Sequence, residues 1–221
     1  MRLADRTWPD VPEGALVVVP VGSLEQHGPH LPLDTDTVIA SAVAEGVVRA
    51  LDPATALLAP AVAFGASGEH EDFPGTVSIG TSALEHVIVE LGRSLARWAA
   101  RVVLVNGHGG NAEALDSACA VLRHEGRDAA WLPCRHGDIH AGRGETSLML
   151  RLAPARVRLD RATAGASGDL AALLPSMRRD GVRAVSESGV IGDPSGASAD
   201  EGDALLAAMI ERARSELRGP S

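Results

Sequence analysis

Short apolar runs alternate with amphipathic stretches along the 221-residue chain. Four runs have the length of a buried strand and occupy residues 16–19, 55–60, 101–105 and 129–132. Between and after them, apolar side chains recur at helical spacing. This spacing predicts helices over residues 36–47, 82–98, 115–122, 145–150 and 198–217. A repeated order of strand and helix is typical of a mainly parallel sheet covered by helices on both faces.

Local signals predict where some of these helices begin and end. Ser82-x-x-Glu85 and Ser198-x-x-Glu201 have the spacing of a capping box, and Gly126 is placed to end the third helix. Residues 65–76 are too polar and glycine-rich for regular structure, and we expect residues 154–196 to be irregular as well. The length suits one sizeable domain, so we expect a single domain over residues 1–221.

Each predicted strand is followed by a polar loop. The loops contain Glu25, Ser67, His108 and His140. Ligands of parallel sheets bind outside the carboxyl ends of the strands, so we expect the four loops to gather at one edge of the sheet.

The first of these loops, residues 20–36, is the richest in chemistry. Glu25 and His27 are one residue apart, so in an extended segment their side chains point to the same side, and Asp36 opens the next helix. Carboxylate and imidazole groups on a turn stiffened by prolines make a site for a divalent metal ion. The alternative interpretation is an exposed polar loop whose acids cap the helix.

The later loops offer further ligands. Residues 106–111 place three glycines around His108, which favours a metal ligand at a strand end, although a plain glycine turn with Asn111 as N-cap is the alternative. Asp138 and His140 share one side of an extended segment, and Glu145 stands at a helix start, where an acid is also expected for purely electrostatic reasons. His86 and His124 are predicted to lie on solvated helix faces.

Composition excludes several classes of protein. A formal net charge of −9 argues against nucleic acid or an anionic membrane as partner, and no apolar run approaches the length of a membrane span. The first residues lack the features of a signal peptide, and Cys119 and Cys134 lie outside any C-x-x-C pattern, so we expect reduced thiols and a cytoplasmic protein. The chain has no tyrosine, which leaves proton transfer near neutral pH to histidines and acids.

Four blocks of the sequence resemble the creatininase family of metal-dependent amidohydrolases. They are Pro20–Asp36, Ser67 with Phe73–Thr76, Asn106–Asn111, and His140-Ala141-Gly142-x-x-Glu145-Thr146-Ser147. The resemblance spans nearly the whole chain and implies a three-layer α/β/α fold with a dinuclear metal centre.

The resemblance also implies roles for individual residues. Glu25, His27, Asp36 and His108 match metal ligands, with Asp36 bridging two divalent ions (Fe²⁺, Zn²⁺ or Mn²⁺). Creatininase has a glutamate ligand at the position of Gly110, and we expect Glu145 to replace it.

Other matched residues lie on the substrate side. Asp138 and His140 match polar residues there, with His140 our candidate proton donor and Asp138 its assistant, and Ser67 matches a serine that contacts substrate. Glu69 and His70 are an alternative acid and base pair or a loop scaffold.

The substrate is inferred from one branch of the family. Creatininase closes tryptophans over creatinine, whereas the corresponding loop here has Arg135, His136 and Gly137. Two stretches, the first loop and Gly65-x-Ser67-x-Glu69-His70, are most similar in sequence to one group of creatininase-like peptidases. Those peptidases release a modified C-terminal Val-Tyr dipeptide from a ribosomal precursor peptide. On that interpretation Arg135 or Arg143 holds the C-terminal carboxylate of the peptide.

Two other functions are compatible with the same residues. One is hydrolysis of a cyclic amide or formamide by another member of the family, and the other is a non-catalytic metal-binding protein. Members of the family form ring-like homo-oligomers, so the resemblance implies a hexamer or octamer.

Overall fold

The computed structural model describes residues 1–52, 54–137 and 139–218. Its sheet consists of β1 (Ala15–Val21), β2 (Ala56–Leu58), β3 (Ala99–Asn106) and β4 (Ala129–Pro133). The strands lie in the order β2-β1-β3-β4 and every neighbouring pair is parallel. The parallel sheet predicted from the four apolar runs is therefore confirmed.

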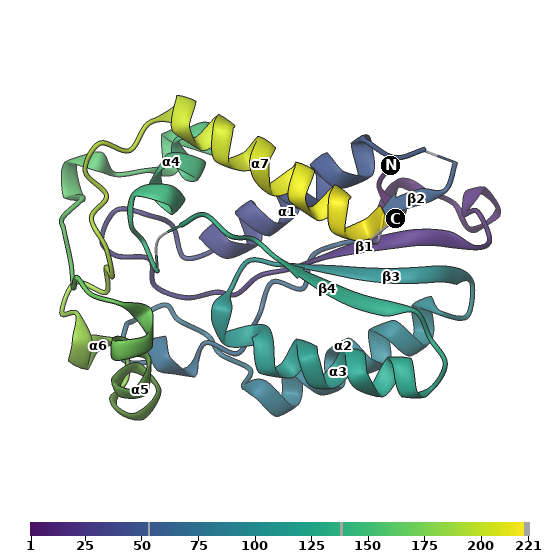
Figure 1. The fold of residues 1–221 in the computed structure, drawn as a ribbon, viewed down its shortest axis with the longest axis horizontal. Helices are drawn as coiled ribbons and strands as arrows, with labels where there is room; N and C mark the ends of the chain where they lie inside the picture. The colour runs from purple at the N-terminus through teal and green to yellow at the C-terminus, as the bar shows by residue number, and fades with distance from the viewer. Residues whose placement is uncertain (53, 138, 219–221) are drawn as a thin grey trace.

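The helices form a layer on each face of this sheet. Their bounds are α1 (Thr35–Arg49), α2 (Thr81–Leu95), α3 (Ala112–His124), α4 (Arg143–Leu152), α5 (Leu170–Asp180), α6 (Val182–Val185) and α7 (Ala199–Arg218). Figure 1 shows α1, α4 and α7 on one side of the sheet and α2 and α3 on the other, with α5 and α6 beyond one end of it. The expected three-layer α/β/α architecture is present.

Side-chain alternation along β1 builds both hydrophobic cores. Val17 and Val19 pack with Leu84 and Leu115 of α2 and α3, while Val18 packs with the α1 face that contains Val43. Because successive strand residues point to opposite faces, a strand covered on both sides must be apolar at every position. This requirement explains the continuous run of valines.

The expectation of irregular structure over residues 154–196 is wrong in part, because α5 and α6 lie within it. Pro175 lies inside α5, and the Asp169 side chain caps its start by accepting from the Ala171 N–H. Met177 packs with Val182 and Ile191 in a small third core. The helix is short and its apolar stripe depends on these distant partners, so its period alone was too weak to show it.

One predicted helix start is also wrong. The second helix begins at Thr81 with Gly80 as N-cap and has no side-chain cap, so Ser82 and Glu85 form no capping box. Glu85 instead accepts a hydrogen bond from the Ser117 hydroxyl (2.6 Å), which links α2 to α3.

Two other end signals hold. The Glu201 N–H donates to Ser198 Oγ (3.2 Å) at the start of α7. Gly126 follows α3 with a φ of 77°.

The strand order reverses between β1 and β3, and ligands of parallel sheets bind outside such a reversal. The chain leaves β1 for β2 on one side and returns to form β3 on the other, so the loops after β1 and β3 diverge at the carboxyl edge of the sheet. Four of the predicted metal ligands follow these two strands, namely Glu25, His27, Asp36 and His108. No helix among the described residues is long and apolar enough to cross a membrane.

Candidate metal centre

Four of the predicted ligands lie together, buried, at the carboxyl edge of β1 and β3. Glu25 Oε1 is 3.1 Å from His108 Nδ1, and His27 Nε2 is 3.1 Å from Asp36 Oδ1. The two pairs are joined by a 3.7 Å approach of His108 Nδ1 to Asp36 Oδ2. The loop after β1 supplies Glu25 and His27, the first turn of α1 supplies Asp36, and the loop after β3 supplies His108. Two imidazoles and two carboxylates thus surround one small volume.

Glu145 reaches the same volume from the first turn of α4. Its Oε2 lies 4.0 Å from His27 Nε2 and accepts a hydrogen bond from the Ala141 N–H (2.5 Å). Ala141 has a φ of 53°, and among the described residues it is the one non-glycine residue with a positive φ. A strained turn of this kind persists only where the surroundings impose it. Here the turn directs a backbone donor at a buried carboxylate.

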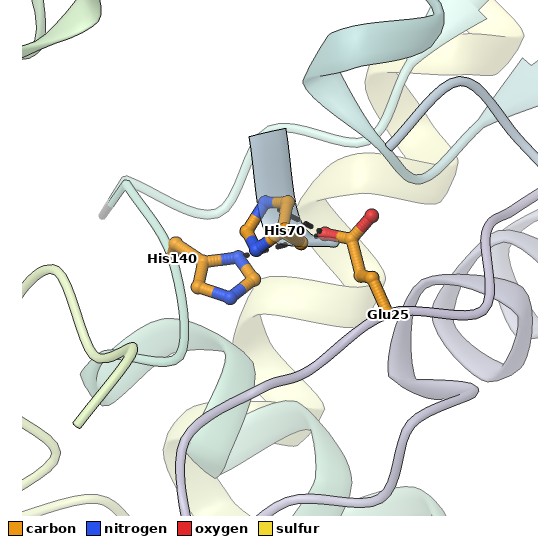
Figure 2. A group of neighbouring side chains, drawn as sticks. All are labelled: Glu25, His70 and His140. Carbon is orange, nitrogen blue, oxygen red and sulfur yellow. Dashed lines mark ion pairs between the residues drawn. The ribbon is translucent and has the colours of Figure 1, made fainter. Parts of the chain in front are cut away.

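Two further histidines lie close to Glu25, as Figure 2 shows. His70 Nε2 lies 3.3 Å and His140 Nδ1 lies 3.8 Å from Glu25 Oε1. Among the described residues, three groups have ligand atoms close enough to hold one metal ion. They are Glu25–His27–Asp36, His27–His140–Glu145 and Glu25–His70–His140.

The donor set fits a divalent cation. The Ser23 hydroxyl lies 2.6 Å from Glu25 Oε2 and 2.7 Å from Asp36 Oδ2, yet a hydroxyl has a single proton to donate. Glu25 Oε1 is buried and accepts no hydrogen bond from any residue in the described part of the chain. Buried carboxylates that share one donor and expose a free lone pair to imidazole nitrogens form the mixed oxygen and nitrogen set of transition-metal sites.

The pKa values of this cluster show how its charge is balanced without a metal. Burial opposes protonation of His27 and His108, but Asp36 beside His27 and Glu25 beside His108 outweigh it and raise each pKa to about 10. Burial raises the pKa of Glu25. Burial also opposes ionisation of Asp36, but the charge on His27 outweighs it and lowers that pKa. Without a metal ion, the positive charges of protonated His27 and His108 thus balance the charge of the carboxylates beside them.

The other two histidines remain neutral. Burial and then the charge on His27 lower the pKa of His140 to about 4. Burial and then the neighbouring His140 and His108 lower the pKa of His70. A neutral imidazole offers one lone pair and one N–H, so each ring must use its two nitrogens differently.

Two cavities give access to the cluster. A cavity of about 580 Å³ is lined by Glu69, His70, His108 and His140 together with apolar side chains of α5. A second cavity of about 290 Å³ is lined by Asp36, Arg135, His136 and Glu145. A substrate can therefore reach the buried ligands from the side of α5 and from the side of the loop after β4.

The structure places the predicted substrate residues unevenly. Ser67 is fully buried with an unpartnered hydroxyl, and Glu69 lies on the wall of the larger cavity, with Oε1 3.5 Å from His108 Nε2. Arg135 lines the smaller cavity. Arg143 pairs with Glu201 (2.8 Å) and lines neither cavity. Asp138 lies outside the described residues.

Sequence reasoning missed several polar residues of the centre. Ser23 and Gln26 were read only as parts of a motif, and His136, whose Nε2 lies 3.3 Å from Glu145 Oε1, only as part of a loop. The alternative interpretation of this loop made Asn111 an N-cap, and Asn111 does stand at the N-cap position of α3, but its side chain makes no capping hydrogen bond. Its amide contacts Gly22 O, Asn106 Oδ1 and the Ala66 N–H, and so joins three strand-end loops. Only their position between predicted ligands could have singled these residues out.

Gly110 has no room for a side chain. A Cβ atom there would lie 2.3 Å from His108 Nε2 and 2.5 Å from Ala66 O. A glutamate at this position would displace His108, and the structure has Glu145 near His27 instead.

Comparison with known proteins adds family evidence to this geometry. A family model described as "Creatininase: Creatinine amidohydrolase" matches residues 4–217. A Mycolicibacterium smegmatis protein named mycofactocin precursor peptide peptidase is 58% identical over 200 residues, which cover 88% of this chain and 81% of that protein. A Pseudomonas putida protein named creatinine amidohydrolase is 33% identical over 178 residues, covering 66% of this chain and 67% of that protein.

The fold has solved counterparts. A structure described as creatininase Mn is 26% identical and has a TM-score of 0.78, covering 98% of this chain and 96% of that one. A mutant creatininase described as Zn-Zn type gives the same values.

Proposed function

The chain belongs to the creatininase family, and from that premise we propose that it is a metal-dependent peptidase that releases a modified C-terminal Val-Tyr dipeptide from a ribosomal precursor peptide. The buried convergence of Glu25, His27, Asp36 and His108 is the observation that carries a hydrolytic metal centre. The peptide substrate is supported by relatives in M. smegmatis and Mycobacterium tuberculosis (strain H37Rv), both named mycofactocin precursor peptide peptidase and 58% and 57% identical.

The proposed ligands are Glu25, His27, Asp36, His108 and Glu145. Asp36 is the proposed bridge between two divalent ions, because its Oδ1 faces His27 and its Oδ2 faces His108. Fe²⁺, Zn²⁺ and Mn²⁺ all accept such ligands, and creatininase neighbours are described as Mn and Zn-Zn forms. When bound, such ions act as Lewis acids on the scissile carbonyl and favour attack by water.

His140 is the proposed carrier of the proton to the leaving nitrogen. Its Nε2 lies 2.8 Å from the Gln26 carbonyl, which can only accept, so Nε2 carries the hydrogen and Nδ1 faces the centre with a free lone pair. Nδ1 can therefore take a proton from the attacking water and return it to the amine. The departing nitrogen needs that proton because an amide anion is too basic to leave. Asp138 remains the proposed assistant of His140.

The remaining predicted residues are assigned to substrate binding. Ser67, Glu69 and His70 lie beside or line the larger cavity, where apolar side chains of α5 can contact a side chain of the peptide. Arg135 is the stronger candidate for an anionic group of the peptide, since Arg143 is already paired with Glu201.

A second candidate is hydrolysis of a cyclic amide, supported by the similarity to the Pseudomonas putida creatinine amidohydrolase. A non-catalytic metal-binding protein is the third. These functions are separated by assaying creatinine, a formamide and a Val-Tyr-terminated peptide side by side on protein of measured metal content, with products identified by mass spectrometry. Release of the dipeptide alone supports the peptidase. Turnover of creatinine or the formamide alone supports the second function, and metal-loaded protein inert toward all three supports the third.

Assembly is a separate proposal. We expect a ring-like hexamer or octamer, which light scattering coupled to size-exclusion chromatography measures directly. A monomer would contradict it.

A further inference from the structure

We propose that Gln26 is a positioning residue that determines which ring nitrogen of His70 carries hydrogen, and that His70 is thereby a hydrogen donor facing Glu25 and not a metal ligand. The consequence for metal binding rests on the proposed metal centre, whereas the tautomer itself does not.

The orientation of the Gln26 amide is set by two backbone groups. Its Oε1 accepts a hydrogen bond from the Gly28 N–H (2.8 Å), and its Nε2 donates to Gly189 O (3.1 Å). An N–H can only donate and a carbonyl can only accept, so the amide cannot be flipped without two unfavourable contacts. A Cβ at position 189 would lie 2.0 Å from Gln26 Oε1, so this approach requires glycine there.

The fixed amide then determines the protonation of His70. One of the two hydrogens on Gln26 Nε2 goes to Gly189 O, and the other is available to His70 Nδ1, 2.9 Å away. His140 Nε2, 3.0 Å from the same nitrogen, already donates to the Gln26 carbonyl and needs no hydrogen from the amide. The two hydrogens of Gln26 Nε2 therefore have two acceptors, Gly189 O and His70 Nδ1. His70 Nδ1 is therefore an acceptor, and the single hydrogen of the neutral ring is on Nε2.

With hydrogen on its Nε2, His70 cannot be a metal ligand in the group of three residues drawn in Figure 2. Glu25, His70 and His140 are close enough to hold a cation, but His70 Nε2, 3.3 Å from Glu25 Oε1, carries a hydrogen and has no lone pair for a metal ion. His140 Nδ1 has a lone pair and His70 Nε2 has none. The groups without His70 are Glu25–His27–Asp36 and His27–His140–Glu145, and His70 lies outside them, beside Glu25.

The direct test is nitrogen-15 NMR of histidine-labelled protein, in its metal-free form and loaded with Zn²⁺ alone. We expect His70 to be the Nε2–H tautomer in both forms. An Nδ1–H tautomer, or a His70 Nε2 resonance with the shift of a Zn²⁺ ligand, would overturn the proposal. In Gln26→Glu the amide donor is lost, so His70 should change to the Nδ1–H tautomer. An unchanged tautomer in that folded variant would refute the role of Gln26.

A pair of His70 variants tests the role without relying on Gln26→Glu to fold. Glutamine places its amide nitrogen near the position of His Nε2 and keeps a donor toward Glu25, whereas asparagine reaches only as far as Nδ1. We expect His70→Gln to bind as many Zn²⁺ ions as the unmodified protein, and His70→Asn to bind them about 10–100-fold more weakly. Loss of a whole equivalent of Zn²⁺ in His70→Gln would identify His70 as a ligand. His86→Gln, on an exposed helix face, is the control.

These measurements are independent of catalysis. An enzyme inactive on every peptide would contradict the proposed function and leave the tautomer of His70 unaffected.

Discussion

Glu25 Oε1 and His108 Nδ1 lie 3.1 Å apart because the strands that precede them, β1 and β3, are parallel neighbours in the sheet. Each residue is in the loop after its strand, at the edge where the strand order reverses.

Ser23→Ala tests how the two central carboxylates are held. Loss of the hydroxyl between Glu25 and Asp36 leaves both without their shared donor, so we expect metal affinity to fall about 10–100-fold, as for other groups that support metal ligands. Competition with a chelator of known affinity measures this. Ser82→Ala, on the exposed face of α2, should bind metal normally. An unchanged affinity in Ser23→Ala would show that the contact is incidental.

Gly110→Ala tests the space beside His108. The added Cβ collides with the His108 ring and Ala66 O, so we expect about 1–3 kcal/mol of destabilisation and weaker metal binding. Thermal unfolding and metal titration report the two effects. Gly109→Ala is the matched control, because a Cβ at that position meets nothing within 4 Å. Equal effects of the two substitutions would contradict the steric argument.

His140→Gln separates proton transfer from metal binding. Glutamine has no basic nitrogen in place of His140 Nδ1, so kcat on the peptide substrate should fall about 10²–10⁴-fold. Elemental analysis accompanies the assay. Retained metal with lost turnover supports the proton carrier, whereas lost metal would assign His140 to the ligand set.

Metal binding should release protons and strengthen as pH rises. His27 and His108 have pKa values raised to about 10 in the metal-free protein by the carboxylates beside them, so both are protonated at neutral pH. A metal ligand must be neutral imidazole, so each proton must leave on binding. Calorimetry of Zn²⁺ binding in buffers with different ionisation enthalpies counts these protons. Affinity independent of pH between pH 6 and pH 8 would contradict the assignment.

Arg135→Ala and Arg143→Ala should differ in their effect on the peptide. Arg135 lines the smaller cavity beside Glu145, so its loss should raise KM for a peptide with an acidic terminus, whereas Arg143 is paired with Glu201 and its loss should leave KM unchanged. Steady-state kinetics with free and amidated peptides measures the difference. Equal KM values for both variants and the unmodified protein would show that neither Arg135 nor Arg143 binds the substrate.

Much of the fold was evident in the sequence because it depends on local periodicity. The valines of β1 predict a strand buried on both faces, and the stripe containing Leu84 and Ile88 predicts a helix on one of them. His86 and His124 are exposed as expected for the polar faces of their helices. The α5 helix did not follow from its own residues, because its stabilising contacts, such as Met177 with Ile191, come from a loop near the end of the chain.

The sequence by itself determined the order of the four strands and of the helices α1 to α4 and α7, the loops that carry acids and imidazoles, and the family to which the chain belongs. The tertiary structure alone decided which atoms of those loops meet. It placed Glu145 beside His27, paired Arg143 with Glu201, and aligned Gln26 between His70 and His140. The physical reason is that periodicity reports which face of an element is buried, whereas the direction of a hydrogen bond depends on groups that the chain brings together only when it folds.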